Sequence, residues 1–237
     1  MSARFDVVAL DADDTLWINE ERYRDGEELL GRLLGGRFDA ATISAHVLET
    51  ETRNVRIFGY GVKSFTLSLM EVAVALGDGD VGGPAIRSLL DHGKWMLEGE
   101  IELYDGIPDT LERLARDHRL MLITKGDSFE QSHRVGRSGV THLFRDIEIV
   151  GTKTPASYRA LLERYDIDPG RFLMVGNSLK SDVLPVVEIG GHAIHVPREI
   201  TWAHENVDES ELDRSRFTTL ANLMELPDWL AEAGSTG

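Results

Sequence analysis

Apolar and polar positions follow two different spacings along the chain, one typical of strands and the other of helices. A short apolar run at residues 5–10, bounded by aspartates, predicts a buried β-strand. From about residue 19 to residue 98 the apolar residues recur at helical spacing, and no strand is needed there. The helices predicted in this block span residues 20–34, 40–54, 64–76 and 84–97.

Beyond residue 100 the pattern changes to an alternation of short apolar runs and helical segments. Strands are predicted at residues 119–124, 146–150, 171–175 and 192–196, and helices at residues 108–117, 128–138, 155–165 and 181–189, with 217–230 as a last helix. This rhythm is typical of βαβ units and of a mostly parallel sheet. We therefore expect an α/β fold with a doubly wound, Rossmann-like sheet, interrupted after its first strand by an all-helical insert. The expected domains are a core of residues 1–16 and 100–237 and a helical cap of residues 17–99.

The composition suits a soluble globular protein and argues against several classes of function. Hydrophobic residues make up 42% of the chain and charged residues 28%, which is enough for a sizeable core. The formal net charge of -16 disfavours nucleic-acid binding, because a polyanion would be repelled. No apolar run approaches the roughly 20 residues that cross a bilayer, and the start, MSARFDVVAL, lacks the features of a secretory signal. We expect a cytoplasmic protein that binds neither nucleic acid nor membranes.

Polar side chains follow the carboxyl ends of four predicted strands. In an open parallel sheet these ends lie along one edge, so we expect the side chains to converge in one crevice. Carboxylate, amide and hydroxyl oxygens beside a lysine suit Mg²⁺ together with a substrate phosphate. The residues are Asp11, Asp13, Thr124, Lys125, Lys153, Asn177 and Asp182.

This set of groups is well matched to phosphoryl transfer. The reaction needs neutralised equatorial oxygens, an in-line nucleophile and a proton for the leaving oxygen. One carboxylate can be the nucleophile. A second carboxyl two residues further on lies on the same side of an extended segment, and it can act first as an acid and then as a base. A hydroxyl and a lysine can hold the phosphate oxygens.

Four segments, DADDTL, LITKG, GTKTP and VGNSLKSD, resemble in this order the motifs of the haloacid dehalogenase-like hydrolase superfamily. The resemblance covers nearly the whole chain and implies a Mg²⁺-dependent phosphatase of a small phosphorylated metabolite, acting through an aspartyl-phosphate. It also implies a helical cap inserted after the first motif. The roles it implies are nucleophile for Asp11, general acid and base for Asp13, phosphate binding for Thr124 and Lys153, and Mg²⁺ binding for Asp11, the Asp13 carbonyl, Asn177 and Asp182. Lys125, beside Thr124, is a further candidate for phosphate binding, with a solvated side chain as the alternative.

Two positions refine this expectation. Dehalogenases of the superfamily expel a halide without an acid or a metal and lack an aspartate at the place of Asp13, so its presence favours a phosphate ester. The superfamily usually has aspartate at the place of Asn177. An amide oxygen can ligate Mg²⁺ but adds no charge, so we expect weaker metal binding, or binding only together with substrate, with Asp182 as the anionic contact.

Three other functions stay open at this point. A phosphomutase of the same superfamily would share every catalytic residue. A catalytically weakened binding or regulatory protein is supported by Asn177 alone, and a 2-haloacid dehalogenase comes last. The sequence names neither the phosphate ester nor the oligomeric state. Arg53, Arg56, Tyr60 and Lys63, between two predicted cap helices, either reach a second part of the substrate or form an exposed basic turn.

Overall fold

A six-stranded parallel sheet is the centre of the fold in the computed structural model, which describes residues 4–79, 81–198, 207 and 217–235. The sheet order is β3-β2-β1-β4-β5-β6, and every neighbouring pair is parallel. This order confirms the predicted α/β, Rossmann-like fold class. The strands are β1 (Val7–Leu10), β2 (Leu120–Lys125), β3 (Asp146–Val150), β4 (Phe172–Gly176), β5 (His192–His195) and β6 (Thr218–Thr219).

Contacts within the chain define two compact units. The first, here the sheet unit, consists of Met1–Ile18, Ile101–Lys125 and Val135–Gly237. The second, the helical unit, consists of Asn19–Glu100 and Gly126–Arg134. None of the helices in the described residues is long and apolar enough to cross a membrane.

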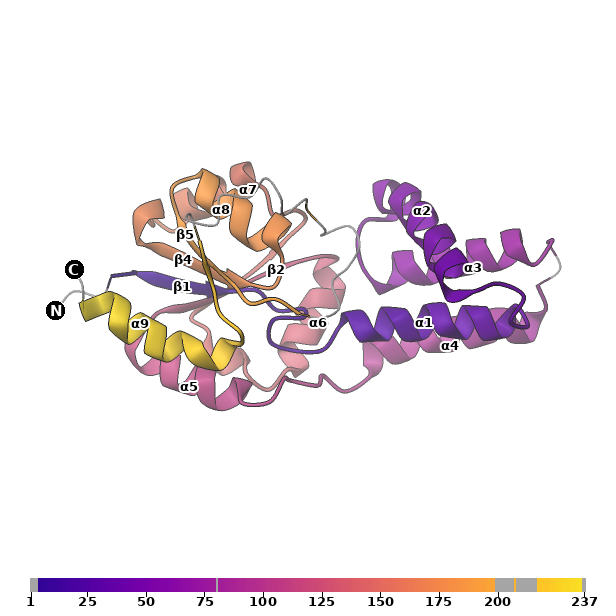
Figure 1. Ribbon diagram of the computed structural model, residues 1–237, viewed down its shortest axis with the longest axis horizontal. Helices are drawn as coiled ribbons and strands as arrows, with labels where there is room; N and C mark the ends of the chain where they lie inside the picture. The colour runs from indigo at the N-terminus through magenta and orange to yellow at the C-terminus, as the bar shows by residue number, and fades with distance from the viewer. Residues whose placement is uncertain (1–3, 80, 199–206, 208–216, 236–237) are drawn as a thin grey trace. The chain divides into compact units, whose positions relative to one another are not determined.

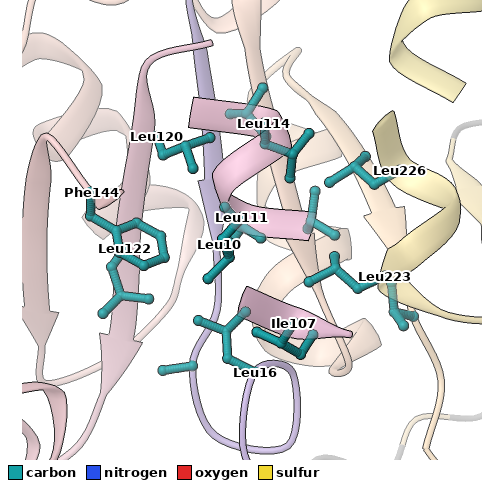
Figure 2. Packing of buried hydrophobic residues seen from close by; sticks show 14 of the residues in the cluster. Leu10, Leu16, Ile107, Leu111, Leu114, Leu120, Leu122, Phe144, Leu223 and Leu226 are labelled. Carbon is teal, nitrogen blue, oxygen red and sulfur yellow. The ribbon is translucent and has the colours of Figure 1, made fainter. Parts of the chain in front are cut away.

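Helices cover both faces of the sheet. Alternate residues of β1 point to opposite faces, which is why the strand reads as one continuous apolar run. Val8 and Leu10 share a cluster with residues of α5 and α9, as Figure 2 shows for Leu10, and Val7 and Ala9 share one with residues of α7 and α8. Figure 1 shows these two pairs of helices on opposite faces of the sheet. The helices and helical turns of the sheet unit are α5 (Ile107–Asp117), α7 (Pro155–Arg164), α8 (Leu184–Glu188), α9 (Leu226–Ser235), a π-helical turn (Leu179–Val183) and 3₁₀ turns at Thr141–Leu143, Pro169–Arg171 and Leu223–Glu225.

The helical unit has a hydrophobic core of its own. Its apolar residues, among them Leu30, Val47, Phe65 and Leu89, are fully buried where four helices meet. These residues recur at the helical spacing seen in the sequence, so one face of each helix is covered by its neighbours. The helices are α1 (Glu20–Leu33), α2 (Ala40–Phe58), α3 (Val62–Leu76) and α4 (Gly83–Glu98). The first part of α6 (Ser128–Arg137) also belongs to this unit.

Two predicted helices begin later than expected. The helix predicted at 217–230 is wrong in its first half, because Thr218–Thr219 pairs with β5 as strand β6 and α9 begins only at Leu226. The helix predicted at 181–189 begins as the π-helical turn and becomes regular at Leu184. β-branched threonines favour the strand, and π-helical turns often occur at functional sites.

A buried carboxylate holds the start of α3 within the helical unit. Gly61 precedes this helix and has no side chain to cap it. Glu130 of α6 accepts hydrogen bonds from the backbone amides of Val62 (2.8 Å) and Lys63 (3.1 Å), and its side chain is only 4% exposed. An added Cβ at Gly61 would lie 2.3 Å from Glu130 Oε2, so glycine is required there. Glu130 therefore supplies the cap that the helix lacks.

Replacing this cap should destabilise the helical unit. For Glu130→Ala we expect the free energy of unfolding to fall by about 1–3 kcal/mol, because two buried amides lose their acceptor. Urea denaturation measures the change. The control is Glu49→Ala, which removes an exposed ion pair with Arg53 and should cost less than about 0.5 kcal/mol. Equal losses in the two variants would contradict a capping role for Glu130.

Candidate active site

The order of the strands reverses at β1, which has β2 on one side and β4 on the other. In open α/β sheets ligands bind at such a point, outside the carboxyl ends of the strands. Asp11 follows β1 directly, and its amide still donates to the Val175 carbonyl of β4 (2.9 Å). Asn177 follows β4 directly. Asp11 and Asn177, two residues that the sequence singles out, therefore lie at the point where the strand order reverses.

Lys153 joins two of the predicted carboxylates in a buried cluster. Its ammonium donates to Asp11 Oδ1 and to Asp182 Oδ1, the second contact at 2.7 Å. Asp11 and Lys153 are 6% exposed and Asp182 is 1% exposed. The lysine comes from the loop after β3 and the carboxylates from the segments after β1 and β4. Three segments that are distant in sequence, two loops and the π-helical turn, thus meet around one ammonium group.

The charges in this cluster do not balance. Burial raises the pKa of the Asp11 carboxyl to about 7; Lys153 opposes this shift, and the charges of Asp182 and Asp13 add to it. Burial alone would lower the pKa of the Lys153 ammonium, but Asp11 and Asp182 outweigh it and hold that pKa above its ordinary value. The lysine therefore stays protonated, and once Asp11 is ionised, two carboxylates share one ammonium group.

Thr15 links the nucleophile candidate to Asn177. Its hydroxyl is within hydrogen-bonding distance of two side-chain oxygens, Asp11 Oδ2 (3.0 Å) and Asn177 Oδ1 (3.3 Å). It also accepts a hydrogen bond from the backbone amide of Asn177 (3.1 Å). Two oxygens, one from a carboxylate and one from an amide, therefore converge on a single hydroxyl. Sequence reasoning did not assign Thr15 to the site; its place four residues after Asp11 was the available signal.

Asp182 is held by backbone as well as by Lys153. Its Oδ2 accepts a hydrogen bond from the Ser178 amide at 3.1 Å. An added Cβ at Gly176 would lie 2.2 Å from the same oxygen, so only glycine allows β4 to end this close to the carboxylate. Lys125, the other lysine predicted for the site, donates to the Ser181 hydroxyl at 3.2 Å.

Thr124 has a buried hydroxyl that makes no hydrogen bond within the described part of the chain. The residue is 1% exposed and lies on β2. Leu10 of β1 pairs with Leu122 of β2. Thr124 is two residues beyond Leu122 and Ala12 is two residues beyond Leu10, so Thr124 lies at the same end of the sheet as the segment that follows β1. Buried polar atoms without partners are rare in folded proteins and call for an explanation. A ligand oxygen outside β1 and β2 would supply one.

Asp13 is half-buried and accepts a hydrogen bond from the indole Nε1 of Trp17 at 2.7 Å. Arg198, after β5, donates to the backbone carbonyls of Asp14 (2.9 Å) and Thr15 (3.1 Å). Sequence reasoning did not assign Arg198 to the site, and it left Trp17 open as either a hinge-side wall of the pocket or a part of the cap core. These bonds hold the turn that carries Asp13.

The donor set fits a hard divalent cation. In the described residues no three side chains of histidine, cysteine, aspartate or glutamate form a metal cluster. An amide oxygen or a main-chain carbonyl can serve as a ligand in place of a third such side chain. The oxygens of Asp11 and Asn177 converge near Thr15, and two aspartates, Asp11 and Asp182, contact one lysine. A second positive charge at this place would relieve the excess of negative charge.

The four residues singled out between the second and third predicted cap helices lie in the helical unit. Arg53 pairs with Glu49 and Glu71, and Lys63 pairs with Asp127 and Glu130. Both cations thus have carboxylate partners inside that unit. Arg56 is exposed and Tyr60 is half-buried.

Comparisons with known proteins agree with this fold. A family model described as haloacid dehalogenase-like hydrolase matches residues 5–190. A haloacid dehalogenase-like family hydrolase from Xanthomonas campestris is 32% identical, with 99% of this chain and 98% of that chain covered and a TM-score of 0.85. A 2-haloacid dehalogenase from Pseudomonas syringae shares the fold at 22% identity, with 97% and 99% covered and a TM-score of 0.63.

A glyceraldehyde 3-phosphate phosphatase from Methanothermobacter thermautotrophicus is 29% identical over 118 residues. The match covers 47% of this chain and 52% of the relative, so the chain spans about half the length of that protein. The family model, by contrast, covers most of the chain, including all four motifs. The resemblance read from those motifs is confirmed, and the chain belongs to the haloacid dehalogenase-like hydrolase family.

Proposed function

We propose that the protein is a Mg²⁺-dependent phosphatase that hydrolyses the phosphate ester of a small metabolite through an aspartyl-phosphate on Asp11. The observation that carries the proposal is the buried, unpartnered hydroxyl of Thr124. It lies on the strand beside β1 and is a hydrogen-bond donor with no acceptor in the described residues. A phosphoryl oxygen would supply that acceptor, beside a carboxylate nucleophile and a buried ammonium group.

The first chemical step is attack by Asp11 on phosphorus. One carboxylate oxygen forms a bond to phosphorus while the bond to the leaving oxygen breaks on the opposite side. Hydrogen bonds from Lys153 and Thr15 orient Asp11, and a carboxylate oxygen that accepts one bond still has a lone pair. Asp13, in its acid form, gives its proton to the leaving alcohol oxygen.

The second step regenerates the enzyme. Asp13, now a carboxylate, takes a proton from water as that water attacks the phosphorus of the aspartyl-phosphate. The bond between phosphorus and Asp11 breaks, and inorganic phosphate leaves. The same group thus acts as acid and then as base, as the reversal of proton flow requires.

The remaining side chains hold the phosphoryl group and the charge that develops on it. Thr124 would donate to one phosphoryl oxygen, and the fixed charge of Lys153 would stabilise the others in a site with little water. Lys125, which follows Thr124 on β2 and donates to Ser181, is the residue we assign as a second cation for the phosphate.

Asp11, the Asp13 carbonyl, Asn177 and Asp182 are the groups we assign to Mg²⁺. When bound, the ion would neutralise and orient the phosphoryl oxygens. The excess of carboxylate charge around Lys153 supports this assignment, because a divalent cation would balance it. Asn177 contributes an oxygen but no charge, so we expect modest metal affinity.

The leaving group decides between a phosphatase and a dehalogenase. A halide is stable as an anion and needs no proton, whereas an alkoxide leaving from a phosphate ester does. Asp13 therefore supports an ester substrate. We also propose that residues 17–99 act as a cap that selects the substrate, because the chain enters this helical segment directly after Asp11 and Asp13.

A screen of phosphorylated metabolites with Mg²⁺, Mn²⁺ or Co²⁺ tests the proposal. We expect release of inorganic phosphate from at least one ester, with the panel starting from short sugar phosphates such as glyceraldehyde 3-phosphate. For Asp11→Asn we expect kcat to fall by more than about 10³-fold, because the nucleophile is lost. Asp6→Asn is the matched control: Asp6 pairs with exposed Arg171 before β1 and should leave kcat unchanged.

The same screen separates the alternatives. Halide release from 2-haloacids without metal would replace the phosphatase by a dehalogenase. Turnover that requires a sugar bisphosphate would replace it by a phosphomutase. No turnover of any ester by folded protein would favour a binding protein. Activity that survives in Asp11→Asn would refute the proposed nucleophile.

Asn177→Asp tests the metal assignment through binding. The change adds a carboxylate to the proposed donor set, so we expect Mg²⁺ to bind about tenfold more tightly, since affinity rises with the charge of the ligands. Without metal the melting temperature should fall, because position 177 shares the Thr15 hydroxyl with Asp11 and a second carboxylate there would repel the first. Isothermal titration calorimetry and thermal melts with and without Mg²⁺ measure the two effects.

The control for this variant is Asn222→Asp. Asn222 caps the 3₁₀ turn Leu223–Glu225 with its side chain, and aspartate caps equally well. We expect no change in Mg²⁺ affinity there. If Asn177→Asp also leaves Mg²⁺ affinity unchanged, position 177 is not a metal ligand.

A further inference from the structure

Trp17 is a large buried residue with an unusual polar contact. Its side chain is 1% exposed and packs in the hydrophobic core of the sheet unit with Leu16 and Ile107. Its indole Nε1 nevertheless donates to Asp13 Oδ1 at 2.7 Å. An indole N–H can donate a hydrogen bond but cannot accept one or release its proton to a carboxylate. It can therefore orient Asp13 without competing for the proton that Asp13 transfers.

The backbone between the two residues closes a tight turn. Asp14 adopts the left-handed conformation with φ of 58°, and its amide donates to the Trp17 carbonyl at 2.8 Å. Left-handed conformations are uncommon outside glycine, although aspartate tolerates them better than most residues. The turn brings the indole back beside the carboxylate that stands four residues earlier.

Residues from two other segments of the sheet unit hold this turn in place. Trp17 forms an antiparallel bridge with Leu103, and the amide of Tyr104 donates to the Leu16 carbonyl at 3.0 Å. Arg198 holds two carbonyls of the turn, and its guanidinium lies 3.6 Å from the centre of the Tyr104 ring. The position of the indole is thus fixed by backbone on two sides and by the core around its ring.

We propose that Trp17 is a positioning residue that fixes the carboxyl group of Asp13 for proton transfer to the leaving group. The inference rests on the proposed phosphatase function. With Oδ1 held by the indole, the carboxyl has one orientation in the turn, and Oδ2 is the oxygen that carries the proton to the leaving alcohol. Trp17 does not touch the substrate; it acts through Asp13.

Trp17→Phe removes the donor and keeps most of the buried ring. We compare kcat/KM for an alkyl phosphate with kcat/KM for p-nitrophenyl phosphate, whose leaving group needs no proton. General acid catalysis contributes about 10²–10⁴-fold, so a misplaced acid should cost the alkyl ester about tenfold or more. For p-nitrophenyl phosphate we expect a change below about twofold, because phosphoenzyme formation then needs no acid.

Trp229→Phe is the matched control. Trp229 stacks on Phe5 and lies in α9, so this variant reports the cost of losing an indole elsewhere in the same unit. We expect it to leave both values of kcat/KM unchanged. Equal losses for the two substrates in Trp17→Phe would mean that Trp17 only supports the fold, and no loss for either would mean that the hydrogen bond is irrelevant; both results overturn the proposal.

A double-mutant cycle adds a second test. In an Asp13→Asn background, Trp17→Phe should change the kcat/KM for the alkyl phosphate no further, because the acid is already gone. An additional loss equal to that in the wild-type background would contradict action through Asp13.

A spectroscopic measurement avoids any change at Trp17. The chain has four tryptophans, and their indole N–H groups give separate resonances in an NMR spectrum of ¹⁵N-labelled protein. Asp13→Ala should shift one of these resonances strongly, and an unchanged set would overturn the proposal even if Trp17→Phe does not fold. These measurements also separate failure of this inference from failure of the proposed function. If the function is wrong, the wild type hydrolyses neither ester, whereas Asp13→Ala still shifts an indole resonance.

Discussion

The buried ammonium of Lys153, between the carboxylates of Asp11 and Asp182, is the interaction on which the site depends. The three groups come from the segments that follow β1, β3 and β4, and none is more than 6% exposed. Removing one member of a buried ion pair typically costs about 3–5 kcal/mol, because a charge is left without a partner. The lysine therefore fixes the two carboxylates relative to each other, and the sheet fixes the three segments.

The same interaction leaves more carboxylates than cations in the site. One ammonium group cannot balance Asp11, Asp13 and Asp182, and burial raises the pKa of Asp11. A divalent cation would offset the carboxylate charge, and an oxygen of a phosphate ester would accept a hydrogen bond from the unpartnered hydroxyl of Thr124. Family membership makes the chain a hydrolase. The unpartnered hydroxyl of Thr124 and the carboxyl of Asp13 are our reasons for proposing a phosphatase within the family.

Much of the fold could be predicted from the sequence, because short apolar runs alternate with helical segments after residue 100. The meeting of Asp11, Lys153 and Asp182 could be anticipated too, since parallel strands end at one edge of a sheet. Strand β6 could not, because a two-residue strand depends on its pairing with β5. The bond between Trp17 and Asp13 depends on a left-handed residue between them, which no spacing reveals.

Mass spectrometry of enzyme quenched with acid during turnover tests the central claim most directly. Our account predicts one added phosphoryl group on the peptide that contains Asp11, formed with substrate and lost as turnover ends. An enzyme that releases phosphate without any such adduct, or with the adduct on another residue, would contradict the assignment of Asp11 as the nucleophile.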